Sequence, residues 1–378
     1  MTKSVSLAHS AHPDRGIASQ PYAEHVESVV RDARRYAAYM CNYGSNDAGS
    51  LISSIVRSAE FHDLGKLDPF NQRILSGQST EKMINHVDAG VASLLQDQLF
   101  DAAYLVSAHH LGYSYLHEEA KKGSRFLRDL KICEETDEHL ASYLASHAEC
   151  VQPKLSSTHA SADKPSTLAR RLALSCLVDA DHGDTARHYF PYSNPPVTET
   201  LWEDRIKALE SFVEGLQRTS QSSPRSGYRQ RVFESCLKAD INPSIRCCDS
   251  PVGTGKTTAV MAHLLRVAAE RKLRHIIVVL PYTNIIKQSV AVYRNALVLD
   301  GEDPEAIVAA HHHQADFESY ALRNFSSLWQ APITVTTSVQ FFETLASNST
   351  SRLRKLHELP GSAVFIDETH AALPSWFW

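Results

Sequence analysis

Residues 250–257 read SPVGTGKT; they follow a short apolar run at 245–248 and precede a candidate helix at 256–270. A strand, a glycine-containing loop and a helix in this order are typical of a phosphate-binding loop, because backbone N–H groups and the helix N-terminus face the anion. In such a loop Lys256 reaches the β- and γ-phosphates and Thr257 binds Mg²⁺. We therefore predict that ATP and Mg²⁺ are bound by Ser250, Gly253, Thr254, Gly255, Lys256, Thr257 and Thr258.

The sequence around and after this loop alternates between short apolar runs and helical stretches. The expected strands lie at 245–248, 276–280, 307–310, 333–336 and 364–366, and the expected helices at 256–270, 283–297 and 338–347. This alternation predicts an α/β domain with a parallel sheet covered by helices. The last expected strand precedes Asp367 and Glu368, which would hold Mg²⁺ and position the attacking water. An acidic pair alone is often a solvated loop, so this prediction depends on the phosphate-binding loop.

Composition narrows the class of protein. The 378 residues are enough for about two domains, and a 43% hydrophobic content allows packed cores. Lys and Arg total 38 against 43 Asp and Glu, a net charge of −5, which excludes a strongly basic nucleic-acid binder but not a local basic groove.

The longest apolar runs fall far short of the ~20 residues of a membrane helix, and the first residues lack the apolar segment of a signal peptide. Because the seven cysteines form no CxxC pair, we expect reduced thiols in a cytoplasmic protein without a membrane partner.

Histidine is unusually frequent, with 20 residues, and the mostly helical first half carries several at the edge of apolar helical stripes. Burying so many polar groups is costly unless something pairs with them. Imidazole and carboxylate together suit Mn, Fe, Ni, Co or Zn, and two such cations bridged by Asp63 could hold a phosphodiester. A lone buried histidine is more often a hydrogen-bonded core residue. The prediction therefore rests on the whole set, namely His25, His62, Asp63, His86, His109, His110 and Asp181, with Asp179 as the alternative to Asp181.

This ordered set, with the run EFHDLGK at 60–66, resembles the HD phosphohydrolase superfamily. The His109-His110 pair and LVDADHGDT at 177–185 extend the resemblance to the HD nuclease domain of the CRISPR-associated type I nuclease-helicases. The resemblance implies that the seven residues bind two divalent transition metal ions, and that Lys66 and Thr185 neighbour the metals or the scissile phosphate. It favours Asp181 over Asp179, because Thr185 follows Asp181 by four residues as in the family pattern. The implied catalytic residues are His62, Asp63, Lys66, Asp181 and Thr185.

The second half resembles the superfamily 2 helicases. Gln230, in GYRQRVF, looks like their adenine-reading glutamine, and DETH at 367–370 resembles the DEAH-type box, in which Glu368 would be catalytic. The polar run at 218–226 predicts a linker between an all-α HD-type nuclease domain at 1–217 and a first RecA-like helicase lobe at 227–378. A complete helicase of this kind has a second lobe. We therefore expect a fragment or a shortened gene product that binds nucleotide, hydrolyses ATP weakly and does not unwind DNA processively.

The function implied is metal-dependent cleavage of single-stranded DNA in CRISPR antiviral interference, by a nuclease fused to an ATP-binding helicase lobe. The implied partners are the displaced DNA strand and a guide-RNA surveillance complex of the Cascade type, and a monomer is expected. Two other functions stay open: an HD phosphohydrolase that acts on small nucleotides, and a catalytically silent module that binds nucleic acid or nucleotide. The phosphate-binding loop argues against the first, and the intact ligand positions argue against the second.

Overall fold

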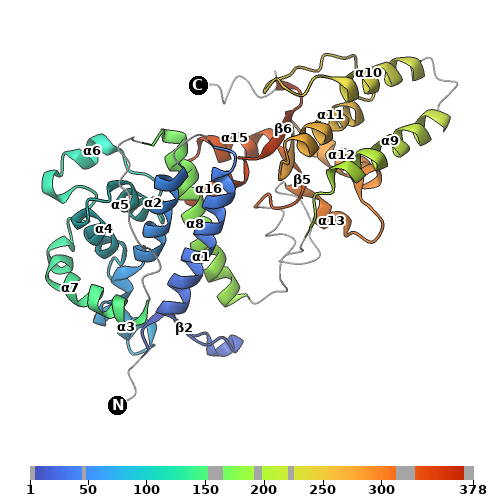
Figure 1. Ribbon diagram of the computed structural model, residues 1–378. Helices are drawn as coiled ribbons and strands as arrows, with labels where there is room; N and C mark the ends of the chain where they lie inside the picture. Colours follow the sequence, from blue (N-terminus) through green and yellow to red (C-terminus); the bar gives the residue numbers. More distant parts are fainter. Residues whose placement is uncertain are drawn as a thin grey trace. The chain divides into compact units, whose positions relative to one another are not determined.

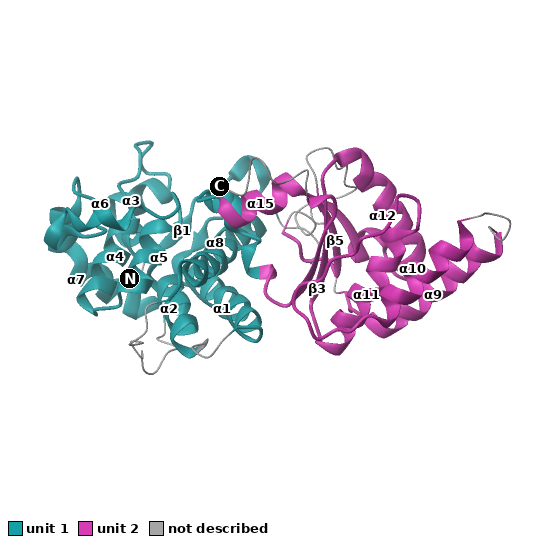
Figure 2. Ribbon diagram, turned by 90° about the horizontal axis from the view of Figure 1, so that it is seen from above, with its two compact units in different colours: residues 1–192, 347–357 teal, residues 193–346, 358–378 magenta. Residues whose placement is uncertain are grey.

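The computed structural model describes residues 5–44, 48–151, 165–190, 198–219, 225–311 and 328–369 (Figure 1). The chain forms two compact units, which Figure 2 shows in different colours. The first unit comprises Met1–Tyr192 and Ser347–His357, and the second comprises Ser193–Ala346 and Glu358–Trp378. The short stretch Ser347–His357, called the 347–357 segment below, therefore belongs to the first unit, although the chain on both sides of it belongs to the second.

Helices make up most of the first unit, as predicted for the first half of the chain. Helix α1 packs against α2 and α8, and α4 packs against α5 and α7. A short antiparallel pair, β1 (Leu7–His9) and β2 (Gln20–Pro21), precedes α1, and a 3-10 turn, η2 (Leu64–Leu67), follows α2. The helices are α1 (Tyr22–Cys41), α2 (Ala48–Phe61), α3 (Pro69–Leu75), α4 (Val87–Gln96), α5 (Phe100–Ala108), α6 (Leu116–Ala120), α7 (Cys133–Cys150), α8 (Thr167–Tyr189) and, in the 347–357 segment, α16 (Thr350–Leu353).

The second unit contains a parallel sheet with the strand order β4-β5-β3-β6. Strand β3 lies between two neighbours and is buried along its whole length, so it reads as a continuous apolar run, as expected for a parallel sheet covered by helices. The strands are β3 (His275–Leu280), β4 (Val308–His311), β5 (Ile333–Thr337) and β6 (Ser362–Ile366), and the helices are α9 (Trp202–Thr219), α10 (Ser226–Lys238), α11 (Lys256–Glu270), α12 (Thr283–Leu297), α13 (Pro304–Ile307) and α15 (Ser338–Ala346).

Four of the five expected strands and all three expected helices of this half are confirmed. The prediction of a strand at 245–248 is wrong, because these residues form no strand in the structure. Ile245 is 87% exposed, so its apolar side chain is not buried against a sheet neighbour. A short apolar run becomes a strand only where a neighbouring strand pairs with it, and sequence does not reveal that pairing.

The division between the units differs from the predicted domain boundary. The predicted first domain, 1–217, includes most of helix α9. In the structure, Trp202, Leu209 and Val213 of this helix are buried in the core of the second unit together with residues of α11 and α12. The structural division falls between Tyr192 and Ser193. Within the predicted linker, residues 218–219 end α9 and residues 225–226 begin the α10 region, whereas 220–224 lie outside the described residues.

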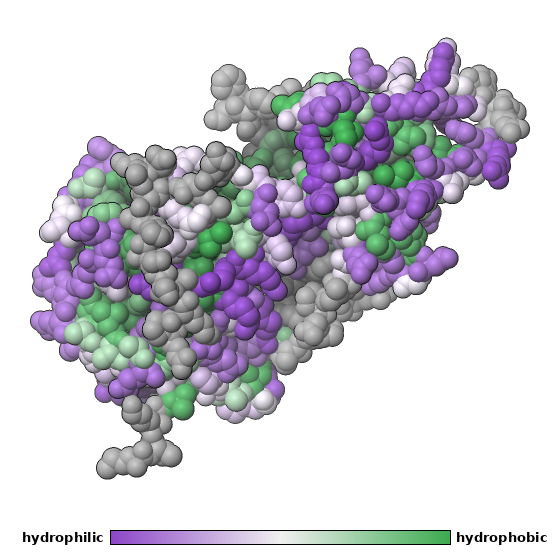
Figure 3. All heavy atoms as spheres, viewed as in Figure 1, coloured by the Kyte–Doolittle hydropathy of each residue, from purple (hydrophilic) through white to green (hydrophobic). Residues whose placement is uncertain are grey.

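Hydrophilic and hydrophobic residues are interspersed over the face of the molecule seen in Figure 3. Among the helices that the structure describes, none combines the length and the apolar character needed to cross a membrane.

Candidate metal centre and nucleotide site

The predicted metal ligands are brought together in the first unit from separate elements. Most lie at helix ends, where the chain turns and can direct a side chain away from its own helix. Their positions are the first turn of α1 for His25, the junction of α2 and η2 for His62 and Asp63, the N-cap of α4 for His86, the C-cap of α5 and the next residue for His109 and His110, and the middle of α8 for Asp181.

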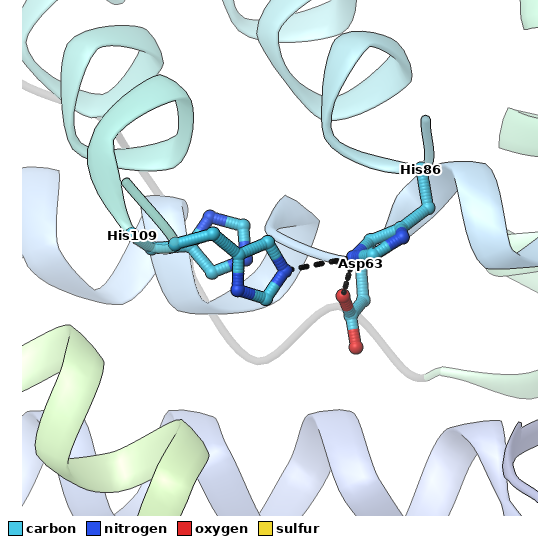
Figure 4. A group of neighbouring side chains, drawn as sticks. Asp63, His86 and His109 are labelled. Atoms are coloured by element: carbon cyan, nitrogen blue, oxygen red, sulfur yellow. Dashed lines mark hydrogen bonds and ion pairs between the residues drawn. The ribbon is translucent and has the colours of Figure 1, made fainter. Parts of the chain in front are cut away.

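Two groups of potential ligand atoms result. In each group the nitrogen and oxygen atoms that face one another all lie within 4.8 Å. Figure 4 shows the side chains of Asp63, His86 and His109 converging. One group consists of His25, His62 and Asp181, and the other of Asp63, His86, His109 and His110.

Asp63 connects the two groups through its two carboxylate oxygens. Its Oδ2 lies 3.1 Å from His25 Nε2 and 3.4 Å from His62 Nε2. Its Oδ1 lies 3.3 Å from His86 Nε2. The carboxylate is thus in position to contact one cation through each oxygen, which is the arrangement expected of a bridging ligand.

The hydrogen bonds of the Nδ1 atoms determine which ring nitrogens are left to bind a metal. His62 Nδ1 lies 2.8 Å from Ala59 O, and His109 Nδ1 lies 2.6 Å from Val106 O. Because a carbonyl oxygen only accepts, each Nδ1 donates, and in the neutral ring each Nε2 keeps a lone pair. His109 Nε2 is buried and has no hydrogen-bond partner within the described part of the chain. In the neutral form, the Nε2 atoms of these two rings are therefore available to bind a cation.

Both carboxylates of the site are held in the charged form. Burial alone would raise the pKa of Asp63, but the neighbouring His62 and Lys66 lower it well below its usual range. Burial likewise opposes ionisation of Asp181, but the hydrogen bond and charge of His62 lower its pKa well below its usual range. Charged carboxylates are the form that binds a divalent cation.

The imidazoles differ in their protonation. Burial lowers the pKa of His86 to about 4, with Asp63 partly opposing the shift. Burial and the neighbouring His110 hold the pKa of His109 well below its usual range. For His25 burial opposes protonation, but hydrogen bonds to Asp184 and Asp63 outweigh it and raise the pKa to about 9. His86 and His109 are therefore neutral at pH 7 and able to bind a metal.

Sequence reasoning missed Asp184, which orients His25. Its Oδ2 accepts a hydrogen bond from His25 Nδ1 at 2.8 Å and another from Gln20 Nε2 at 2.8 Å. The opposite ring nitrogen of His25 then faces Asp63 and Asp181. A carboxylate behind a histidine ligand is a common support of metal sites. The sequence could have indicated Asp184, because it follows Asp181 by three residues and so lies on the same helix face.

Lys66 and Thr185 lie near the candidate ligands, whereas Asp179 does not join them. Lys66 Nζ lies 2.6 Å from Asp63 Oδ2. Thr185 Oγ1 lies 3.3 Å from His9 Nε2, and the His9 ring stacks edge-on against His25 with centroids 4.8 Å apart. Asp179, the alternative to Asp181, instead accepts a hydrogen bond from Arg354 Nε at 2.9 Å. Asp179 is therefore engaged outside both ligand groups.

Gly65 explains how His86 comes close to Asp63. The Gly65 N–H donates to His86 O at 3.0 Å. A Cβ atom at Gly65 would lie 2.5 Å from that oxygen and 2.7 Å from the Cα of His86, which is closer than any side chain tolerates. Glycine is needed here because the two backbones touch.

The predicted phosphate-binding loop lies at the N-terminus of α11 in the second unit. Gly253 and Gly255 have φ values of +81° and +80°, a left-handed conformation that favours glycine. Thr254 is buried, and its hydroxyl donates to Pro251 O at 2.7 Å, which closes the loop. Lys256 and Thr257 begin the helix, where unsatisfied N–H groups favour an anion.

Helix α10 lies beside this loop. It packs against α11, and Arg229 Nε donates to Gly253 O at 3.0 Å. Gln230 follows Arg229 on the same helix; it is exposed, and its Nε2 donates to Glu234 Oε1 at 3.0 Å. Thr258 Oγ1 donates to Gly255 O at 3.0 Å, within the first turn of α11.

The acidic pair after β6 approaches the same end of α11. The Asp367 N–H donates to Val279 O at 2.9 Å and continues the pairing of β6 with β3. Tyr293 of α12 is buried, and its hydroxyl donates to Thr257 O at 3.5 Å. Burial, and then the negative charge of Asp367, raise the pKa of Tyr293. Asp367 and Thr257 therefore share Tyr293 as a neighbour. Glu368 follows in the left-handed region, with a φ of +49°.

We expect the Lys256→Ala variant to bind ATP with Mg²⁺ more weakly by about 10–150-fold. The estimate is the loss of a hydrogen bond to a charged group, about 1.5–3 kcal/mol. Calorimetric titration would measure it, with Lys238→Ala as the control, because Lys238 is an exposed lysine of α10 paired with Glu234 at 3.6 Å. Equal ATP affinity of the Lys256 variant and the wild type would contradict the assignment of this loop.

The second half of the chain matches a known family. The DEAD/DEAH box helicase family matches residues 228–376. The CRISPR-associated nuclease/helicase Cas3 of Haloferax volcanii is 26% identical over 221 residues, which are 50% of this chain and 23% of that protein. The chain thus spans about a quarter of this curated relative.

Solved structures extend the similarity over nearly the whole chain. The crystal structures of T. fusca Cas3 with AMPPNP and with ADP cover 97% of this chain, with TM-scores of 0.54 and 0.56 and 14% sequence identity. This chain covers 47% of each. At this identity the likeness concerns the fold. The sequence similarity to the relative from Haloferax volcanii and the DEAD/DEAH-box match are consistent with a Cas3-family protein that carries a helicase lobe.

Proposed function

We propose that the first unit is an HD-type nuclease that uses two divalent transition metal ions to cleave single-stranded DNA in CRISPR interference. The second unit would bind ATP and Mg²⁺ as the first lobe of a superfamily 2 helicase. The partners would be the displaced DNA strand and a guide-RNA surveillance complex of the Cascade type. The names of the Cas3 relatives and the DEAD/DEAH-box match support the general class of this proposal.

The observation that carries the nuclease proposal is the position of Asp63 between the two ligand groups. Its side chain is only 2% exposed, and its two oxygens face histidines of different groups. Asp63 Oδ2 is paired with the Lys66 ammonium at 2.6 Å, so the nuclease proposal rests on the histidines around it rather than on a missing donor. Here the ring of His62 faces Asp63 with Nε2, the nitrogen that does not donate to Ala59.

The seven predicted residues would hold the metal ions, and Asp184 would orient His25. When bound, such ions neutralise charge on a phosphodiester and lower the pKa of water. Lys66 is buried next to Asp63, so its ammonium adds positive charge at the place where a phosphate would approach. His9, which is within hydrogen-bond distance of Thr185, would support His25 through the edge-on contact of the two rings.

The test is cleavage of circular single-stranded DNA by the full chain without ATP, after chelation and with Mn²⁺, Ni²⁺, Co²⁺, Fe²⁺ or Mg²⁺ added back. Circular DNA excludes contaminating exonucleases, and Asp63→Asn protein prepared in parallel excludes contaminating endonucleases. Small nucleotides would be offered under the same conditions. We expect cleavage that requires a transition metal and Asp63.

Each other result would overturn part of the proposal. Hydrolysis of small nucleotides without cleavage of DNA would replace the nuclease by a nucleotide phosphohydrolase. Metal binding without turnover of either substrate would indicate a binding module. Folded wild-type protein that takes up no metal would remove the basis of the nuclease proposal altogether.

A further inference from the structure

The 347–357 segment contacts the chain next to both groups of candidate ligands. At its beginning, Thr350 Oγ1 donates to His110 O at 3.3 Å. At its end, α16 packs on α8, and Arg354 pairs with Asp179, two residues before Asp181. A part of the chain that lies far from these ligands in sequence thus supports their backbone in the first unit.

Asn348 makes a paired contact with the turn after His110. Its Nδ2 donates to Tyr113 O at 2.7 Å, and its Oδ1 accepts from Tyr113 N at 2.9 Å. Gly112 lies in this turn with a φ of +84°, and a Cβ atom there would lie 2.0 Å from Asn348 O. The turn and the segment therefore fit only because residue 112 is glycine.

The contact with α8 anchors the segment. Ser175 is fully buried; its hydroxyl donates to Leu353 O at 2.6 Å and accepts from His357 N at 3.0 Å. Asp179 is 1% exposed, and Arg354 Nη2 lies 2.8 Å from its Oδ1. A buried carboxylate is strongly destabilised without its partner, so this ion pair fixes the segment on the helix that carries Asp181.

His110 needs such support because helix α5 ends at Ala108. His110 is exposed, and the next residue, Leu111, is 89% exposed, so burial restrains this part of the turn little. The Nε2 atom of His110 nevertheless lies 2.9 Å from the Nε2 atom of His86. Holding it there requires a fixed backbone.

We propose that Asn348 is a positioning residue for His110, and that the 347–357 segment holds the His110 turn in its metal-binding conformation. The inference rests on the proposed function, in which His110 binds a metal ion. Support from outside the ligand set commonly changes metal affinity by about 10–100-fold. Asn348 would act in this way through the backbone of Tyr113, without contacting the metal.

The test is a titration of the metal-free full chain with Co²⁺, followed by visible absorption. We expect Asn348→Ala to weaken Co²⁺ binding by about tenfold and to change the absorption spectrum, because one histidine is less well placed. Ser351→Ala is the matched control, since Ser351 lies in the same segment and its exposed hydroxyl contacts Ser349 Oγ at 2.9 Å. Gly112→Ala, which disturbs the same contact from the other side, should have a similar effect.

Combining Asn348→Ala with Gly112→Ala should add little to the stronger single effect, because both disrupt one contact. Asn348→Asp keeps the acceptor for Tyr113 N and loses the donor, so it should fold and give an intermediate affinity. A Co²⁺ spectrum and affinity equal to wild type in Asn348→Ala and Asn348→Asp would overturn the inference, even if their melting temperatures fell. If the wild type binds Co²⁺ and cleaves DNA in that case, the proposed function survives; if it binds no Co²⁺, both proposals fail.

Discussion

The Asp63→Asn variant is expected to lose both metal ions and to cleave single-stranded DNA at least about 10³-fold more slowly. Asparagine keeps the shape of the side chain but removes the charge that two cations would share. The two carboxylate oxygens face different ligand groups, so both groups lose a ligand at once. Asp181 belongs to one group, and Asp181→Asn should lose one metal ion and keep the other.

Metal content measured by mass spectrometry after Mn²⁺ loading would separate these outcomes. We expect about two ions for the wild type, none for Asp63→Asn and one for Asp181→Asn. Asp32→Asn is the control, because Asp32 is a buried aspartate of α1 that pairs with Arg187 outside the ligand groups. Equal metal content in the Asp63 and Asp181 variants would contradict a bridging role for Asp63.

The Arg205→Ala variant is expected to destabilise the second unit by about 3–5 kcal/mol. Arg205 of α9 is fully buried, and its two terminal nitrogens each lie 2.7 Å from an oxygen of Glu302. The guanidinium also donates to Thr200 O and Leu297 O. Alanine would take the guanidinium away from these carbonyl oxygens and from the Glu302 carboxylate, which keeps the Leu299 N–H as a donor, while a cavity replaces the side chain.

Tryptophan fluorescence during urea unfolding would measure this loss selectively. All four tryptophans, Trp202, Trp329, Trp376 and Trp378, fall within the sequence of the second unit. Arg218→Ala on the same helix is the control, because Arg218 is 76% exposed and pairs only loosely with Glu214, at 3.4 Å; it should change stability by less than about 0.5 kcal/mol. A loss below about 1 kcal/mol in Arg205→Ala would contradict the central role of this ion pair.

Local patterns predicted the elements of the second unit well. The run at 276–280 became the central strand β3, and the loop at 250–257 leads into α11 as expected. These elements depend on apolar runs and on glycine, which act over a few residues. A strand at 245–248 would have needed a neighbouring strand to pair with, which local patterns do not reveal. The unit to which α9 belongs is likewise decided by the residues that pack on Trp202.

The candidate site was predictable in its residues but not in its supports. Histidines and aspartates at the edges of apolar stripes indicated the ligand set, because buried polar groups need partners. Asn348 and Arg354 carry no such signal, since each is an ordinary polar residue of the second half of the sequence. Their contacts with Tyr113 and Asp179 follow from tertiary packing alone.

The 347–357 segment has a consequence for how such a protein can be divided or inherited. The chain crosses between the two units at 192/193, at 346/347 and at 357/358. One recombination junction, or one protease cut after residue 192, would therefore separate the first unit from a strip of its own structure. A gene that acquired only the N-terminal part would encode helix α8 without the residues that cover Ser175 and neutralise Asp179. We therefore expect two units joined in this way to be inherited together.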